Sequence, residues 1–192
     1  MCIRDRGCWA GAYTGARDMS PETVHRLVKE GYEDLYMRVF VFTGGEPFVR
    51  KDLLDIYEEF DDCWFIIYTN GTLIDEETAE RLGRIGNTMP CLSIDGDREI
   101  CDARRGKGTY DKVMRSFKLL KENGVFYGFS AVATRENIEY LGSDEWIEFV
   151  LDCGCLMGWY FQYIPIGRCP NTGAMPLPTQ RAKFRKDVYH QR

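Results

Sequence analysis

The sequence predicts an α/β fold built on a parallel β-sheet. Short apolar runs rich in β-branched and aromatic residues alternate with longer amphipathic stretches, a pattern typical of repeated strand–helix units. With 192 residues, of which 44% are hydrophobic, the chain suits one folded unit with a sizeable core. The runs and the signals between them allow the elements to be assigned in order.

Five strands are expected from the apolar runs. They are RVFVFT at 38–43, WFIIYT at 64–69, PCLSI at 90–94, VFYGFSAVA at 125–133 and MGWYFQYIPI at 157–166.

Helix starts are readable between these runs. Ser20, Pro21 and Glu22 supply a cap, a proline at the first helical position and an acid in the first turn. The acidic starts at 75–77 and 143–145 have the same chemistry. After the last strand, a proline- and glycine-containing loop leads into a basic helix over 182–192.

The composition limits the class of partner. A net charge of −5 and an isoelectric point near 5.2 disfavour binding to nucleic acid or to an anionic membrane, since both favour a basic surface. No apolar run approaches the roughly 20 residues of a membrane-spanning helix, and no secretory signal opens the chain. We therefore expect a cytoplasmic protein.

The eight cysteines form no regular disulfide framework. In a reducing cytosol they are expected to be free, buried or metal-bound. Cys153 and Cys155 are too close for the usual C-x2-C metal knuckle, so this pair is interpreted as packing.

Glycines and polar residues follow every predicted strand. Because parallel strands point the same way, their carboxyl ends gather at one edge, where ligands bind in barrels and open sheets alike. The segments are TGGEP at 43–47, TNG at 69–71, SIDG at 93–96, 134–137 and IPIG at 164–167.

Each of these segments has an ordinary structural explanation when taken alone. Gly44 and Gly45 allow close approach of a ligand to the backbone, but they also fit a plain turn. Asn70 suits a turn, Ser93 could bind a ribose or cap a strand, and Arg105 could pair with a carboxylate or lie in solvent.

Taken in order, the motifs resemble the core of radical S-adenosylmethionine (SAM) enzymes. The ordered set is GCWAG at 7–11, VFTGGEP at 41–47, YTNGTLID at 68–75, LSIDG at 92–96, the D-x-x-R-G-x-G-T-Y-D-K-V stretch at 102–113 and FQYIPIG at 161–167. The similarity is greatest to the branch of sulfatase-maturating and peptide-modifying enzymes with SPASM-type C-terminal extensions.

The resemblance implies a partial (β/α)6 TIM-like barrel that lacks its first strand here. It also implies a [4Fe-4S] cluster held by cysteines and a bound SAM, whose reductive cleavage yields a 5′-deoxyadenosyl radical for hydrogen abstraction. The partners would be a peptide, protein or small-molecule substrate and an electron donor such as a flavodoxin or ferredoxin.

Motif matching assigns roles to individual residues. Gly44, Gly45 and Glu46 would meet the methionyl ammonium group, and Ser93 the ribose. Arg105 would meet the carboxylate. The remaining cofactor-binding residues are Ile164 and Ile166 at the adenine, with Thr69 and Asn70 lining the same pocket.

The cluster motif departs from the family pattern. Cys8 occupies the last position of C-x3-C-x2-C, but Asp5 and Met1 stand where the other two cysteines belong, and Cys2 is one residue out of register. We expect residues 1–6 not to be native and the chain as written to be inactive.

The resemblance divides the chain into two segments, and one alternative function stays open. Residues 1–167 are expected to form the radical SAM core, and residues 168–192 to begin a truncated C-terminal extension. The alternative is a degenerate barrel without a cluster that binds SAM or a peptide as a recognition module. A generic nucleotide-binding α/β protein is disfavoured, since neither G-x-G-x-x-G nor G-x4-G-K-[ST] occurs.

Overall fold

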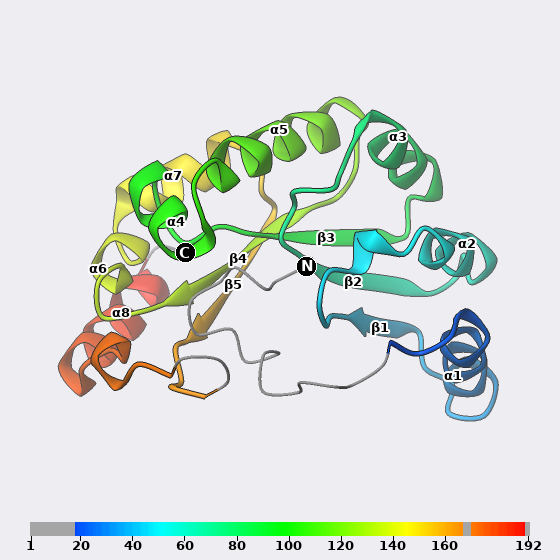
Figure 1. Ribbon diagram of the computed structural model, residues 1–192, viewed down its shortest axis with the longest axis horizontal. Coiled ribbons are helices and arrows are strands. Elements are labelled where there is room, and N and C mark those ends of the chain that lie inside the picture. Colours follow the sequence, from blue (N-terminus) through cyan, green and yellow to red (C-terminus); the bar gives the residue numbers. More distant parts are fainter. Residues whose placement is uncertain (1–17, 167–169, 191–192) are drawn as a thin grey trace.

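The structure, a computed structural model, describes residues 18–166 and 170–190, and its centre is a curved parallel β-sheet. Five strands lie in the order β1-β2-β3-β4-β5, so each strand pairs with its neighbours in the chain. Figure 1 shows the sheet as a half-barrel with the helices on its outer side. The predicted α/β class and the partial TIM-like barrel are confirmed.

Helices alternate with the strands along the chain. The strands are β1 (Val39–Phe42), β2 (Trp64–Thr69), β3 (Thr88–Ser93), β4 (Gly128–Ala133) and β5 (Met157–Gln162). The helices are α1 (Pro21–Glu33), η3 (Pro47–Val49), α2 (Asp52–Glu59), α3 (Glu76–Ile85), α4 (Arg98–Arg105), α5 (Thr109–Glu122), α6 (Ile138–Leu141), α7 (Asp144–Asp152), η4 (Thr172–Ala174) and α8 (Pro178–His190).

All five predicted strands form, but only the second has the predicted limits. The first spans Val39–Phe42 instead of 38–43, and the third spans Thr88–Ser93 instead of 90–94. The fourth begins at Gly128 rather than at 125, because Val125 donates its backbone N–H to Leu120 and completes the end of α5. The fifth ends at Gln162 rather than at 166, and a tight turn between Ile164 and Ile166 follows it.

The predicted helix caps are confirmed. The side-chain oxygens of Ser20, Asp75 and Ser143 accept hydrogen bonds from backbone N–H groups three residues ahead, at 3.2, 2.8 and 3.2 Å. Each bond satisfies an N–H group that the first helical turn leaves unpaired.

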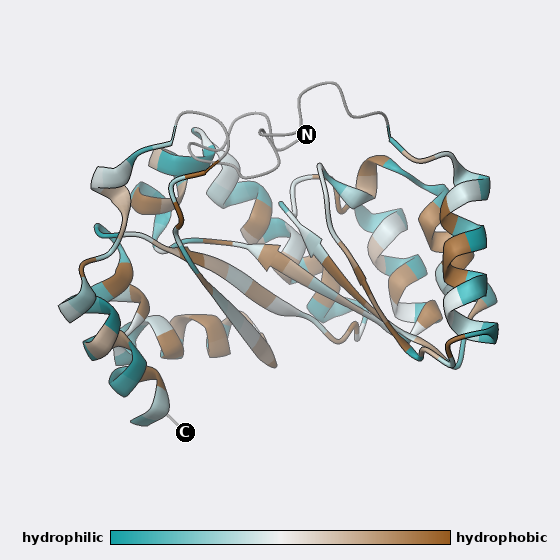
Figure 2. Cartoon of the chain, turned by 90° about the horizontal axis from the view of Figure 1, so that it is seen from below, coloured by the Kyte–Doolittle hydropathy of each residue, from teal (hydrophilic) through white to brown (hydrophobic). Residues whose placement is uncertain are grey.

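The convex face of the sheet carries the main core. Phe65 and Ile67 of β2 are fully buried beneath the helices, as are Leu82 of α3 and Leu120 of α5. Figure 2 shows hydrophobic residues along the strands and on the helix faces turned toward them.

The concave face is more open at its two outer strands. Val41 of β1 is 56% exposed and Phe161 of β5 is 45% exposed. The inner residue Cys91 of the central strand is fully buried. The sheet therefore presents an apolar trough whose two sides face each other across the half-barrel.

Helix α8 closes one side of the molecule. Its Phe184 is buried and packs edge-to-face on Tyr160 of β5, with ring centroids 5.1 Å apart. Among the described helices, none is both long and apolar enough to span a bilayer.

Gly83 of α3 lies where the end of α5 passes closely. A Cβ at this position would collide with the carbonyl oxygen of Asn123. Gly83→Ala should therefore lower the free energy of unfolding by about 1–3 kcal/mol, although alanine normally stabilises a helix by about 1 kcal/mol over glycine. Urea denaturation checks the sign, with the exposed Glu80→Ala on the same helix as control. A more stable Gly83→Ala protein would contradict this packing.

Candidate functional site

A cavity of about 430 Å³ lies at the carboxyl ends of the strands. Every strand contributes to its lining, with Thr43 after β1 and, on the strands themselves, Thr69, Ser93, Ser130 and Gln162. This is the edge at which the sequence predicts ligand binding.

Eight of the nine predicted cofactor-binding residues line this cavity. They are Gly44, Gly45, Thr69, Asn70, Ser93, Arg105, Ile164 and Ile166. The ninth, Glu46, lies behind the wall and is buried. The predicted metal ligand Cys8 lies outside the described residues, so its role stays a prediction.

The glycine pair forms an open stretch of cavity wall. Gly44 has φ of 139°, a conformation that favours glycine. A Cβ built on Gly45 would meet no atom of the described residues within 4 Å. Within the described part of the chain, no other segment fills the space that side chains at these two positions would occupy.

Glu46 connects the first two strand ends. Its carboxylate accepts hydrogen bonds from Thr69 Oγ1 at 2.6 Å, from the Asn70 backbone N–H at 2.7 Å and from the Phe48 backbone N–H at 3.1 Å. These bonds fix the glycine loop to the end of β2.

Polar side chains also meet between the strands. Ser93 of β3 and Ser130 of β4 are hydrogen-bonded neighbours, with Oγ atoms 3.2 Å apart. The Asn70 side chain accepts hydrogen bonds from the backbone N–H and the hydroxyl of Thr72, at 2.8 and 2.7 Å. The segment of cavity wall that contains Asn70 is therefore an Asx turn with a fixed backbone.

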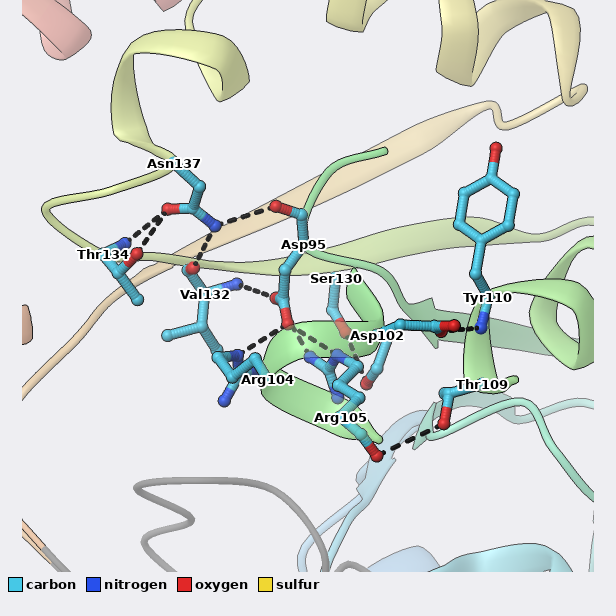
Figure 3. Close-up of polar contacts among 11 residues, drawn as sticks. Asp95, Asp102, Arg104, Arg105, Thr109, Tyr110, Ser130, Val132, Thr134 and Asn137 are labelled. Carbon is cyan, nitrogen blue, oxygen red and sulfur yellow. Dashed lines mark hydrogen bonds and ion pairs between the residues drawn. The ribbon is translucent and has the colours of Figure 1, made fainter. Parts of the chain in front are cut away.

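Two arginines from the end of α4 line the cavity and share one carboxylate (Figure 3). Asp95 accepts from Arg104 Nε at 2.7 Å, and from Arg105 Nε and a terminal nitrogen at 2.6 and 3.0 Å. Burial alone would raise the pKa of the Asp95 carboxyl, but the two guanidinium groups hold it well below its usual range.

Further polar contacts hold this ion cluster in place. The Val132 backbone N–H donates to the Asp95 carboxylate at 2.8 Å, and Asn137 donates to the backbone oxygens of Asp95 and Val132 at 2.8 and 3.0 Å. Asp102 accepts from the backbone N–H groups of Gly108 and Tyr110 and thereby joins α4 to α5. These same two bonds lower the pKa of the Asp102 carboxyl.

Sequence reasoning did not identify Arg104, Ser130 or the partner of Arg105. Arg104 adjoins a predicted site residue and lies in the quoted 102–113 motif, which was its only signal. Ser130 lies 37 residues from Ser93, and nothing local indicates that their side chains meet.

The opposite wall of the cavity is apolar and aromatic. Tyr68 and Phe161 approach edge-to-face with centroids 5.5 Å apart. Burial raises the pKa of Tyr68 to about 12, so its hydroxyl is neutral at physiological pH. Ile164 and Ile166 are 60% and 53% exposed and offer a hydrophobic surface at the rim.

The cysteines of the described segments are packing residues. Cys155 is buried in the main core, as predicted for the 153–155 pair, and burial raises the pKa of its thiol. Within residues 18–166 and 170–190, no group of three or more histidine, cysteine or acidic side chains is arranged to hold a metal ion.

The cavity therefore combines a glycine-lined wall, a hydroxyl pair, two guanidinium groups and an apolar rim. Such a set suits a ligand with an amino-acid end and a nucleoside end, because hydrogen bonds and charge can hold the first while apolar contacts hold the flat base. Together, fold and cavity define a half-barrel with a ligand-sized cavity at the carboxyl edge of its sheet.

Comparison with known protein families agrees with a half-barrel that has its cavity at the carboxyl edge of the sheet. The profile of the Radical SAM superfamily matches residues 2–146. The chain belongs to the Radical SAM superfamily, and the predicted radical SAM core is confirmed.

Curated relatives extend the comparison. The AdoMet-dependent heme synthase of Oleidesulfovibrio alaskensis is 29% identical over 179 residues, which cover 90% of this chain and 45% of the relative. The serine-type anaerobic sulfatase-maturating enzyme of Bacteroides thetaiotaomicron is 32% identical over 165 residues, covering 77% of this chain and 38% of the relative. The chain thus spans less than half the length of these two relatives.

Solved structures share the fold. Native anSMEcpe with bound AdoMet and Cp18Cys peptide has a TM-score of 0.78 at 23% identity, covering 96% of this chain and 55% of that one. Streptococcus suis SuiB bound to its precursor peptide SuiA has a TM-score of 0.79 at 19% identity, covering 96% and 42%.

Replacing Glu46 tests the connection between the strand ends. Glu46→Gln puts an amide NH2 group where a carboxylate oxygen accepts, so one buried donor of the site loses its partner. The free energy of unfolding should fall by about 1–3 kcal/mol. Urea denaturation checks this, and the exposed Glu80→Gln should change it by less than about 0.5 kcal/mol. Equal effects of the two variants would exclude the structural role of Glu46.

Proposed function

We propose that this chain is the core of a radical SAM enzyme and that its cavity binds SAM. When SAM and a [4Fe-4S] cluster are bound, they supply a 5′-deoxyadenosyl radical for hydrogen abstraction from a substrate. The observation that carries the proposal is the convergence of eight motif-matched residues on one cavity in a chain of this family.

The cavity residues have distinct roles in this proposal. The backbone at Gly44 and Gly45 receives the methionyl ammonium group, Ser93 binds the ribose and Arg105 binds the carboxylate. The apolar rim at Ile164 and Ile166 packs on the adenine. The predicted contact of Glu46 with the ammonium group stays a prediction, while its hydrogen bonds support a role in holding the glycine loop.

The apolar side of the cavity supports a further role for this chain. Tyr68 and Phe161 line the cavity beside the polar groups, with their rings in edge-to-face contact. Such a surface excludes water from a reactive intermediate, which limits side reactions.

The substrate is proposed as a peptide, a protein side chain or a small molecule. Support comes from relatives named as a sulfatase-maturating enzyme and heme synthases, and from the peptide-bound solved structures of similar fold. An electron donor such as a flavodoxin or ferredoxin and a cytoplasmic location belong to the same proposal. The division into residues 1–167 and 168–192 stays a prediction.

The alternative is a barrel that binds SAM or a peptide without a cluster. The comparisons favour the enzyme core, since the curated relatives above are named as enzymes. The incomplete cysteine motif is the one observation that favours the barrel without a cluster.

Gly45→Ala tests the proposed ligand directly. Because the new methyl group meets no atom of the described residues within 4 Å, stability should stay within about 0.5 kcal/mol of the wild type. If SAM lies against this backbone, its affinity should fall about 10-fold or more, since the methyl group would occupy ligand space. Isothermal titration calorimetry on the full chain measures this, with Glu80→Ala as control. Unchanged affinity of Gly45→Ala would place the ligand elsewhere.

The cysteine pattern gives a second expected outcome. With Asp5 and Met1 at the positions of two thiolate ligands, the chain as written should hold a cluster poorly after anaerobic reconstitution with iron and sulfide. Iron content and the visible spectrum measure it, and Cys8→Ser should lower the iron content further while Cys153→Ser should not. A stable brown protein with about four irons per chain would show that the present residues suffice.

A further inference from the structure

Asp95 differs from the other acidic residues near the cavity in its complete burial and in its partners. Its side chain has no exposed surface, yet it is charged and lies between β3 and α4. A buried carboxylate is costly unless each oxygen is paired. Here both oxygens accept hydrogen bonds, and two of the three donor residues, Arg104 and Arg105, are cations that line the cavity.

The contacts of each arginine restrict its orientation. Arg105 meets Asp95 with two nitrogens, a bidentate geometry that fixes the plane of the guanidinium group. Arg104 uses its Nε on the same oxygen, Oδ2, that Arg105 Nε contacts. The side chains of Arg104 and Arg105 are only 14% and 5% exposed, so neither can swing far from the cavity wall.

The carboxylate itself is held from the other side. Val132 donates its backbone N–H to Asp95 Oδ1, and Asn137 binds the backbone oxygens of both residues. The Asn137 side-chain oxygen in turn accepts from the backbone N–H and the hydroxyl of Thr134, at 2.6 and 2.9 Å. Figure 3 shows these groups converging on Asp95 from β4, α4 and the start of α6.

We propose that Asp95 is a positioning residue that aims both arginines into the cavity, and that Arg104 joins Arg105 in binding the carboxylate of the ligand. This inference rests on the proposed function, which assigns SAM to the cavity. It adds a second guanidinium group to the site and explains why two consecutive arginines share one buried carboxylate.

The test compares two probes that differ in the amino-acid end. SAM carries the carboxylate, whereas 5′-methylthioadenosine has the same nucleoside and lacks the amino-acid group. Calorimetric titration of the full chain measures both affinities. Asp95→Asn should weaken SAM binding about 10- to 100-fold, the range of a lost charge-assisted contact, and change 5′-methylthioadenosine binding by less than about twofold.

A matched control removes the same charge from another arginine–aspartate pair. Asp111 accepts from Arg98 at 2.5 Å on the surface, so Asp111→Asn should leave both affinities unchanged. Equal losses of both probes in Asp95→Asn would indicate a purely structural role and overturn the inference. Unchanged SAM affinity would overturn it as well.

A second variant covers the case in which Asp95→Asn does not fold, as circular dichroism would show. Arg104→Lys keeps the charge but loses the planar fork, so SAM should bind about 3- to 10-fold more weakly with 5′-methylthioadenosine unaffected. Unchanged SAM affinity in Arg104→Lys would remove Arg104 from the site. A wild-type chain that binds neither probe would instead contradict the proposed function.

Discussion

The buried carboxylate of Asp95 is the interaction on which the cavity depends. Taking a charge out of water costs several kcal/mol, so the fold must bring compensating charges and donors to it. Here Arg104 and Arg105 come from α4 and the Val132 N–H comes from β4. The same contacts that compensate the burial therefore fix the relative positions of β3, β4 and α4.

Glu46 has an equivalent effect at the first two strands. Its carboxylate faces the protein and accepts from the end of β2 and from the turn after the glycines. Two acidic residues of the strand-end motifs thus shape the cavity, Glu46 mainly through the backbone and Asp95 mainly through two arginine side chains. Because the groups that would touch a ligand are held before it arrives, binding requires little reorganisation.

The half-barrel combines this polar edge with an apolar trough. Phe161 and Val41 stay substantially exposed on the concave face, while the helices cover the convex one. Charged groups on one wall of the cavity and aromatic groups on the opposite wall can hold the polar end of a ligand and keep water from its other end. These properties agree with membership of the Radical SAM superfamily.

Much of the fold and of the cavity could be predicted from the sequence, because it depends on residues that are close together in the chain. Alternating apolar runs located all five strands, and Ser20, Asp75 and Ser143 located three helix starts, because strand periodicity and helix caps depend on residues close in the chain. The parallel order then placed the strand-end motifs at one edge, and the resemblance to radical SAM enzymes assigned nine cofactor-binding residues, eight of which line the cavity. The strand limits at 125–128 and 162–166 were less predictable, because backbone hydrogen bonds decide them: Val125 completes the end of α5, and a tight turn follows β5.

Other features depend on contacts between distant residues. The meeting of Ser93 with Ser130 spans 37 residues, and the hydrogen bond from Asn137 to Asp95 spans 42. Nothing in the local sequence distinguishes Asp95 from a solvent-exposed turn residue, and the only signal for Arg104 is its place beside Arg105 in the 102–113 motif. The sequence by itself determined the elements and their order, because propensity and periodicity act within one segment. Only the tertiary structure decided which charges are buried together, because burial arises when separate segments pack.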